Sequence, residues 1–394
     1  MNTKNFQSNN EKEPRKRLSL HTEDIHFCQG TKDRVRIDMQ REFLERGNTE
    51  YFMYRNGYVR LFSNDKHGYR INEPNLKEVE KHVIEEKKEV WIFGDSFTQG
   101  ALADNTESIS SQLELFNDSD LKFKNFGAGG YGVLNSYQTY KWALEEYKQN
   151  PELIIFLAVY NDIEDDLRTA IRLDSYKKGL PDIFDGDGEN SFVYLTRSRL
   201  RELGYDNIYF ARKNILAISY SNYFNQLFPD FVNRRLYALA ERLDRMLRGL
   251  SILFDGNRNN IALANRAEMN LRAFIDLAKR NKTEVSIYLL TSVSSWQNRM
   301  ESAYSTMLDK VSREEGVNFK YIKHSDMQKY SPLLNKGPES LYGSPDTHPN
   351  EFGYFAFAKV IAEDLSRTYN MNFELNKYFV DRTSYVVGEE NCPA

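Results

Sequence analysis

The feature of the sequence that most constrains the fold is an apolar run that enters Gly-Asp-Ser at residues 94–96. Val90 to Phe93 are apolar, and the residues after Ser96 are polar with helix-forming character. This pattern predicts a buried strand, a tight turn and a helix that begins directly after the turn. Ser96 would then lie at the carboxyl end of a parallel sheet and beside a helix N-terminus, where open α/β sheets bind their ligands.

Apolar segments and helical segments alternate along the rest of the chain. The predicted strands cover residues 89–93, 122–126, 153–159, 284–291 and 318–323. The predicted helices cover residues 106–116, 135–149, 263–282 and 351–368. Such alternation predicts an α/β fold, with a central parallel sheet between two layers of helices.

Three segments lie outside this alternating region, which we place at residues 89–372, and a fourth interrupts it. A polar tail is predicted for residues 1–20 and another tail for residues 373–394. Residues 21–88 are predicted to form an N-terminal extension with a β-hairpin, because Asn56-Gly57 separates two aromatic and aliphatic runs. Residues 163–262 are predicted to form a helical insert after the third strand, where it could overhang the strand ends as a lid; whether it closes over the site is left open. Its arginine-rich amphipathic stretch at 234–250 favours a cap helix with a solvated face over a membrane or partner helix.

Composition limits the function classes and the compartment. The chain has 394 residues and a formal net charge of -4, which implies no general affinity for nucleic acid. No apolar run reaches the roughly 20 residues of a membrane helix, and no secretory signal is visible, so a cytoplasmic location is expected. Cys28 and Cys392 lie near opposite ends of the sequence and predict no structural disulfide. The oligomeric state is left open.

Three further stretches carry residues with catalytic chemistry. Asp346 and His348 precede the last predicted helix, and an aspartate can orient a histidine that removes a proton from Ser96. Residues 125–132 form a glycine-rich loop after the second strand, and such a loop can present N–H groups to an oxyanion. Asn161 follows the third strand, where its amide can either donate to the same oxyanion or cap the next helix.

The glycine-rich loop also matches the dinucleotide-binding pattern through Gly127, Gly129 and Gly132. This match does not lie in the first strand–helix–strand unit. The acidic residue that should bind a ribose would fall near residues 150–152, before the next strand and not at its end. Dinucleotide binding is therefore the weaker interpretation.

Taken together, the four stretches resemble the SGNH (GDSL-type) hydrolase family, in the family's order and between residues 94 and 353. The resemblance implies Ser96 as nucleophile and oxyanion donor, Gly130 and Asn161 as further donors, His348 as base and Asp346 as its orienter. The loop at 126–132, with His67 to Arg70 upstream, looks most like bacterial members tied to carbohydrate O-acyl chemistry.

Two departures from the family pattern bear on the site. Val159-Tyr160 stands where a glycine usually precedes the Asn-Asp pair, and Asp346 is two residues before His348 where three is more common.

The sequence thus predicts an ester hydrolase that acts on a small-molecule or glycan ester, for instance an O-acetyl or short acyl group on a carbohydrate. An O-acyltransferase with the same triad and a catalytically silent carbohydrate-binding module are the alternatives. No cofactor and no metal site are expected, because the histidines lack ligand spacing and the acids at 162–166 and 185–189 are explained by a helix start and a turn.

Overall fold

The structure is a computed structural model, and it describes eleven parts of the chain. These are residues 26–27, 35–38, 41–45, 47–48, 50–55, 58–72, 88–117, 121–177, 263–293, 297–343 and 348–375. Several predictions lie outside the described residues: the tail at 1–20, the arginine-rich stretch at 234–250, Asp346 and most of the C-terminal tail. The division into domains, with its boundaries, stays a prediction.

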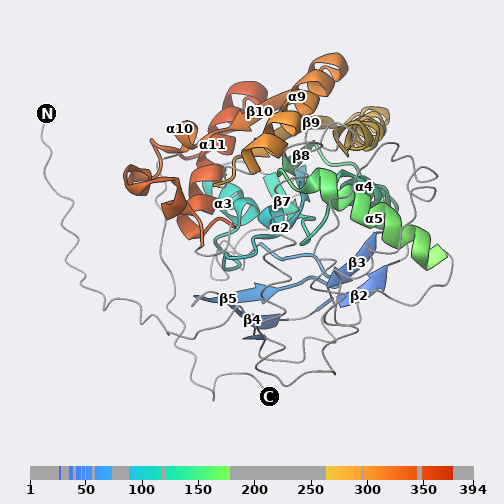
Figure 1. Cartoon of the computed structure of the whole chain (residues 1–394), viewed down its shortest axis with the longest axis horizontal. Helices are drawn as coiled ribbons and strands as arrows, with labels where there is room; N and C mark the ends of the chain where they lie inside the picture. Colours follow the sequence, from blue (N-terminus) through green and yellow to red (C-terminus); the bar gives the residue numbers. More distant parts are fainter. Residues whose placement is uncertain are drawn as a thin grey trace, which may run out of the picture.

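The centre of the fold is a 5-stranded parallel sheet (Figure 1). Its strands are β6 (Lys88–Gly94), β7 (Leu121–Asn125), β8 (Leu153–Ala158), β9 (Glu284–Leu290) and β10 (Asn318–Ile322). Their spatial order is β10-β9-β8-β6-β7, so the direction of winding reverses between β6 and β8. In open α/β sheets the carboxyl ends of the strands at such a reversal form the ligand-binding crevice.

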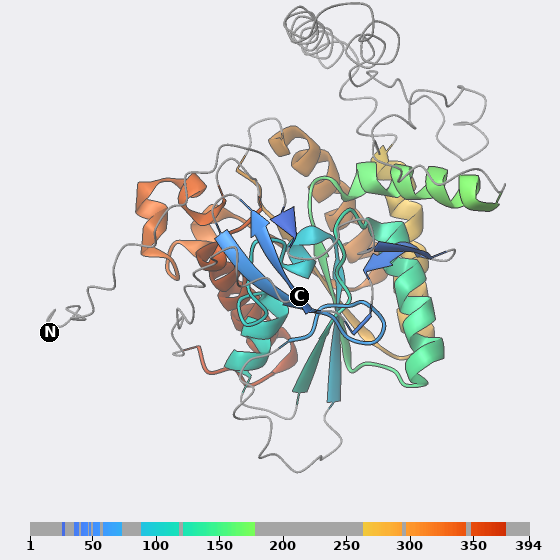
Figure 2. The ribbon, with the colours of Figure 1, turned by 90° about the horizontal axis from the view of Figure 1, so that it is seen from below.

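Helices cover both faces of the sheet, as Figure 2 shows. The face with α3 (Ile109–Phe116) and α11 (Glu351–Tyr369) packs on one hydrophobic cluster. The other face carries α4 (Val133–Tyr147), α5 (Asp162–Lys177), a helix at 263–280 and α9 (Gln297–Glu315). Strand β6 shows why two layers form, because Trp91 faces one cluster and Ile92 the other. The predicted α/β/α architecture is confirmed.

The strand bounds agree with the prediction to within a residue or two, and the acids at 162–166 do open a helix, whereas helix α9 was not anticipated. Helix α5 occupies the start of the segment predicted as an insert, and α9 fills the gap before β10. Helix α9 is strongly charged, and its charged residues obscured the apolar stripe that it buries through Tyr304, Met307, Leu308 and Val311. Smaller helical elements are α2 (Ser96–Gln99), α10 (His324–Met327), η3 (Pro332–Lys336) and η4 (Pro338–Leu341). No helix in the described ranges is long and apolar enough to cross a membrane.

The N-terminal part of the chain forms two small antiparallel sheets below the α/β/α layers in Figure 1. One contains β1 (His26–Phe27), β4 (Glu50–Arg55) and β5 (Tyr58–Ser63), and the other β2 (Val35–Asp38) and β3 (Glu42–Glu45). Arg55 pairs with Tyr58, so the connection is two residues long and the hairpin predicted at 56–57 is confirmed.

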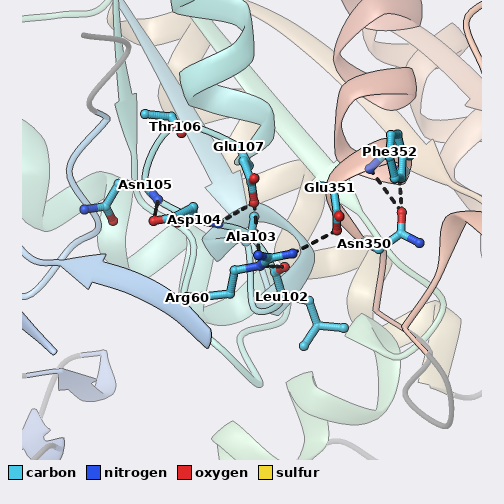
Figure 3. A network of polar contacts seen from close by, with 12 residues as sticks. Arg60, Leu102, Ala103, Asp104, Asn105, Thr106, Glu107, Asn350, Glu351 and Phe352 are labelled. Atoms are coloured by element: carbon cyan, nitrogen blue, oxygen red, sulfur yellow. Dashed lines mark hydrogen bonds and ion pairs between the residues drawn. The ribbon is translucent and has the colours of Figure 1, made fainter. Parts of the chain in front are cut away.

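A buried arginine joins this part to the sheet domain (Figure 3). Arg60 of β5 donates to the Leu102 carbonyl at 3.0 Å and to Glu351 Oε2 at 2.9 Å, at the start of α11. Glu107 Oε2 lies 3.6 Å from Arg60 Nε. All three charged side chains are buried, and each therefore depends on the others for compensation of its charge.

A second buried arginine, Arg70, holds the turn after α2. Its guanidinium donates to the carbonyl oxygens of Gln99 at 3.0 Å, Gly100 at 2.6 Å and Ala103 at 2.6 Å. These carbonyls stand at the C-terminal end of a very short helix, where intrahelical donors are lacking. The N-terminal part therefore supports the turn that ends α2, the helix that begins with Ser96.

Candidate active site

Ser96 stands at the first position of α2, directly beyond the carboxyl end of β6. Asp95 caps this helix, and its Oδ1 accepts the Phe97 N–H at 2.8 Å. A glycine is required before it: Gly94 has φ +150, and a Cβ there would lie 2.2 Å from Thr98 Oγ1. The predicted strand, turn and helix are thus present, and they hold the Ser96 hydroxyl at the edge of the sheet.

His348 lies against this hydroxyl, although 252 residues separate the two in the sequence. The distance between His348 Nε2 and Ser96 Oγ is 2.7 Å. The histidine backbone is held because its carbonyl accepts the Gly343 N–H, while Asn350 caps α11 two residues later. When the imidazole is neutral with its proton on Nδ1, Nε2 accepts the serine proton, which is the arrangement of a base and its nucleophile.

The loop after β7 places backbone donors next to Ser96. It is tied to the serine turn because the Ala128 N–H donates to the Gly94 carbonyl at 3.2 Å. Gly130 has φ +76, which a glycine adopts without strain. Within the described ranges neither the Ser96 N–H nor the Gly130 N–H donates a hydrogen bond. Two donors are therefore left for an acceptor that arrives with a substrate.

The glycines of this loop make room for protein atoms. A Cβ at Gly127 would lie 2.5 Å from the Gln99 nitrogen, and one at Gly132 would lie 2.4 Å from Asp166 Oδ1. Asp166 Oδ1 also accepts the Leu134 N–H at 2.7 Å, so a buried carboxylate occupies the N-terminus of α4. A dinucleotide pyrophosphate needs that position, and the carboxylate would repel it. The dinucleotide interpretation is disfavoured for this reason.

Asn161 follows β8, on the other side of the winding reversal. Its Nδ2 lies 2.6 Å from Asp165 Oδ2 and 3.3 Å from Asp95 Oδ2. Both neighbours are acceptors, which fixes the amide orientation with the nitrogen between them. Both amide hydrogens are therefore engaged, and donation to an oxyanion requires the longer contact with Asp95 to yield.

The buried Asp95 is a feature of the site that the sequence analysis did not single out. Its second oxygen lies 3.4 Å from Ser96 Oγ, farther than His348 Nε2. Burial raises the pKa of Asp95, while the Phe97 N–H and the nearby His348 act in the opposite direction. The sequence signal was its place directly before the helix, which is typical of an N-cap.

The acidic residues that open α5 serve as internal hydrogen-bond acceptors. Asp162 Oδ2 accepts the Val159 N–H at 3.0 Å and the Tyr304 hydroxyl at 3.0 Å. Burial raises the pKa of Asp162 well above its ordinary value, and the nearby Asp95 adds to the effect. In the described part of the chain no group of three or more His, Cys, Asp or Glu side chains is placed to hold a metal ion.

The fold and the site together define an α/β/α protein with a serine–histidine pair at the winding reversal of its sheet. Asp346, the predicted orienter of the histidine, lies outside the described residues. Of the other predicted site residues, the structure brings Ser96 and His348 into contact, places the Gly130 loop against the Ser96 turn, and links Asn161 to Ser96 through Asp95.

Comparisons with known proteins add a similarity of fold. No protein-family profile matches the chain, and no curated protein matches it. Among solved structures the chain is similar to the psychrotrophic esterase EstA from Pseudoalteromonas sp., with 11% identity and a TM-score of 0.38 over 72% of this chain and 100% of that one. A carbohydrate acetylesterase family member from Sinorhizobium meliloti matches with 9% identity and a TM-score of 0.38 over 72% and 100%.

An acetylxylan esterase, Axe2 from Geobacillus stearothermophilus, was solved as a catalytic mutant and matches with 13% identity and a TM-score of 0.36 over 72% and 95%. At such identities and TM-scores, the likeness carries no argument about activity or substrate. The functional conclusion below rests on the geometry of the site.

Proposed function

We propose that this chain is a serine ester hydrolase of the SGNH (GDSL-type) family. The observation that carries the proposal is the 2.7 Å contact between Ser96 Oγ and His348 Nε2 at the carboxyl edge of the sheet. Nucleophilic catalysis by a hydroxyl needs a base at this distance, because serine is almost fully protonated at neutral pH. The free N–H groups of Ser96 and Gly130 supply the second requirement, a site for an oxyanion.

In the first half of the reaction, His348 Nε2 takes the Ser96 proton while Oγ bonds to the ester carbonyl carbon. The carbonyl π electrons move to oxygen, and the resulting oxyanion accepts hydrogen bonds from the Ser96 and Gly130 N–H groups. When this intermediate collapses, the bond to the alcohol oxygen breaks and His348 returns its proton to that oxygen. The products of this half are the free alcohol and an acyl group on Ser96.

The second half releases the acyl group. His348 removes a proton from water, the water oxygen bonds to the acyl carbon, and a second oxyanion forms in the same site. Its collapse breaks the bond to Ser96 Oγ, which recovers its proton from His348, and the carboxylic acid leaves. Asp346 would hold the imidazole tautomer and stabilise the imidazolium in both halves, as the family resemblance implies.

We further propose a short acyl ester as substrate, such as an O-acetyl group on a carbohydrate. The support for this finer assignment is the sequence pattern at 126–132 together with His67 to Arg70. If a sugar hydroxyl replaces water in the second half, the same residues perform O-acyl transfer. The two reactions differ in acceptor binding and not in the serine–histidine pair.

The test combines covalent labelling with turnover. We expect a fluorophosphonate probe to modify Ser96, as read by mass spectrometry, and the parent protein to hydrolyse p-nitrophenyl acetate. Ser96→Ala should lose nearly all turnover and all labelling, with the circular dichroism spectrum of the parent. Ser366→Ala is the matched control, since its hydroxyl only donates to the Ala362 carbonyl within α11. Equal turnover by Ser96→Ala and the parent would refute the nucleophile assignment.

A further inference from the structure

Three buried polar side chains connect strand β3 of the N-terminal part to the oxyanion loop, residues 127–130. Asn64 Nδ2 donates to Glu45 Oε2 at 2.7 Å, and Gln99 Nε2 donates to Glu45 Oε1 at 2.9 Å. At its other end Gln99 Oε1 accepts the Gly129 N–H at 3.2 Å. The exposed fractions of Glu45, Asn64 and Gln99 are 4%, 3% and 7%, so these contacts are formed away from bulk water.

The chemistry of the two neighbours makes the Gln99 amide the group that fits between them. An ionised Glu45 only accepts hydrogen bonds, whereas the Gly129 N–H only donates one. The primary amide of Gln99 presents an NH₂ to the carboxylate and an oxygen to the N–H, and the reverse orientation would leave both contacts repulsive. Glu45 thereby determines which end of Gln99 faces the loop.

Gly129 is the residue through which this chain of contacts reaches the reacting atoms. A Cβ on Gly129 would lie 3.8 Å from Ser96 Cβ, so the loop passes directly over the nucleophile. The next residue is Gly130, whose N–H is one of the two free donors described above. Because consecutive peptide units are rigid, a shift of Gly129 also moves the Gly130 donor.

The other hydrogen bonds of the loop fix its two ends: the Gly127 N–H donates to Asn125 Oδ1 at 2.9 Å, and the Tyr131 N–H donates to the Ala128 carbonyl at 3.1 Å. Gly127 packs closely against the Gln99 backbone nitrogen in α2, and the Ala128 N–H donates to the Gly94 carbonyl. Gly129 and Gly130 are glycines with freedom to move, and Gly130 already occupies the left-handed region. The contact from the Gly129 N–H to Gln99 Oε1 therefore holds the middle of the loop, next to the Gly130 donor of the proposed oxyanion site.

We propose that Glu45 and Gln99 are positioning residues, which hold the Gly129–Gly130 peptide in the geometry that accepts an oxyanion. The N-terminal strands then contribute to the reaction, and are not only an attachment to the sheet domain. This inference rests on the proposed hydrolase function. If the contact between Glu45 and Gln99 is removed, we expect the protein to bind the transition state less tightly while it binds the substrate as before.

The test measures kcat and KM for p-nitrophenyl acetate, per folded molecule, in a set of variants. Gln99→Met keeps the length of the side chain and removes both hydrogen bonds, while Gln99→Asn is too short to span them. For both we expect kcat to fall by about 10²-fold, the usual cost of a displaced catalytic group, with KM unchanged. Glu45→Met removes the acceptor for the Gln99 NH₂, so it should lower kcat in the same direction as the Gln99 variants, with KM unchanged.

Tyr69→Phe is the matched control at the same interface. The Tyr69 hydroxyl lies 3.2 Å from Arg41 Nη1 and 3.4 Å from Thr139 Oγ1, so its loss removes buried hydrogen bonds of the N-terminal part without touching Gly129. This variant should lose thermal stability and retain kcat. A purely structural role of Gln99 predicts the same behaviour for Gln99→Met, and the comparison separates the two.

The outcomes distinguish this inference from the proposed function. If the parent is active and both Gln99 variants keep its kcat, or raise only KM, the positioning role is wrong and the hydrolase stands. If the parent neither turns over the ester nor reacts with a fluorophosphonate at Ser96, the proposed function is wrong and this inference falls with it.

Discussion

The Asn161 amide is held between two carboxylates, and this placement decides how it can act. The 2.6 Å contact with Asp165 is short and charge-assisted, whereas the 3.3 Å contact with Asp95 is long. The charge of a substrate oxyanion is concentrated on one oxygen, whereas the Asp95 carboxylate already accepts hydrogen bonds from Ser96 and Phe97. The oxyanion is therefore the stronger acceptor for the Asn161 amide. We therefore expect one amide hydrogen to turn from Asp95 to the oxyanion as the intermediate forms, with Asp165 retaining the other.

Asn161→Ala tests this assignment. We expect kcat to fall by about 10²–10³-fold with little change in KM, as for other side-chain donors to an oxyanion. Steady-state hydrolysis of p-nitrophenyl acetate measures both constants. Asn150→Ala is a suitable control, because Asn150 is an exposed asparagine that donates only to the Asn281 carbonyl. If Asn161→Ala raises KM and leaves kcat intact, the side chain binds the substrate ground state instead.

Local sequence patterns explain which site residues were predictable. Ser96 and His348 each stand in a short motif whose chemistry can be recognised before any contact is known. Glu45 and Gln99 have no such motif: Glu45 ends a four-residue strand, Gln99 ends a four-residue helix, and 54 residues separate them. Only the folded chain brings a carboxylate to that amide, so their role followed from the structure alone.

Among the helices, α4, α5 and the helix at 263–280 meet at one buried carboxylate. Asp166 of α5 accepts the Leu134 N–H at the start of α4 and the Asn270 amide at 2.8 Å. Burial raises its pKa from an ordinary value of 3.8 to about 6. Between pH 3.8 and about pH 6, Asp166 keeps its proton in the folded chain but has released it in the unfolded chain. The free energy of unfolding therefore decreases as the pH rises through this interval.

Asp166→Asn should therefore stabilise the fold at neutral pH. The amide keeps an oxygen for the Leu134 N–H and carries no charge, and Asn270 can turn its own oxygen toward the new NH₂. At about pH 7.5 we expect a gain of up to roughly 3 kcal/mol in the free energy of unfolding, which shrinks toward zero near pH 4.

Urea denaturation at several pH values measures this gain. Asp276→Asn serves as the control, since Asp276 is exposed and, among the described residues, pairs with Arg280 one helical turn away. A gain for Asp166→Asn that is the same at every pH would contradict the raised pKa as its cause.

The elements themselves were predictable to different degrees, and burial explains the difference. Strands β6, β8 and β9 are apolar on both faces, because each packs on both hydrophobic clusters, and they appear as continuous apolar runs. Helix α9 buries one stripe of side chains among many charged residues, and its sequence therefore gave no clear helix signal. Strands β2 and β3 have four residues each and pair with each other. Val35 to Asp38 alternate apolar and charged residues, but a run this short was not recognised as a strand, and Phe43 and Leu44 of β3 are adjacent and break the alternation.

At the level of the whole molecule, the N-terminal strands and the α/β/α domain share buried charges. Arg60 on β5 compensates Glu351 on α11 and Glu107 before α3, and burial raises the pKa of Glu107. If the two parts separated, these charged side chains would either stay in apolar surroundings without a partner or become exposed to water together with the apolar side chains packed around them. We therefore expect both parts to unfold in one cooperative step.

Hydrogen exchange in the variant Arg60→Met tests this cooperativity. Methionine retains much of the side-chain volume but leaves two buried glutamates without their cation, at a cost of about 3–5 kcal/mol. If the described chain unfolds as one unit, amides of β5 and of β8 should both lose protection by the same factor, on the order of 10²-fold or more.

The matched control for this exchange experiment is an exposed ion pair. Lys88→Met removes the partner of Glu152, and these side chains are 63% and 48% exposed, so protection should change by at most about 1 kcal/mol. Faster exchange in β5 with unchanged exchange in β8 would show that the hairpin opens by itself. In that case Arg60 would stabilise only the N-terminal attachment, and the support that β3 gives to the oxyanion loop would have to persist while β5 is open.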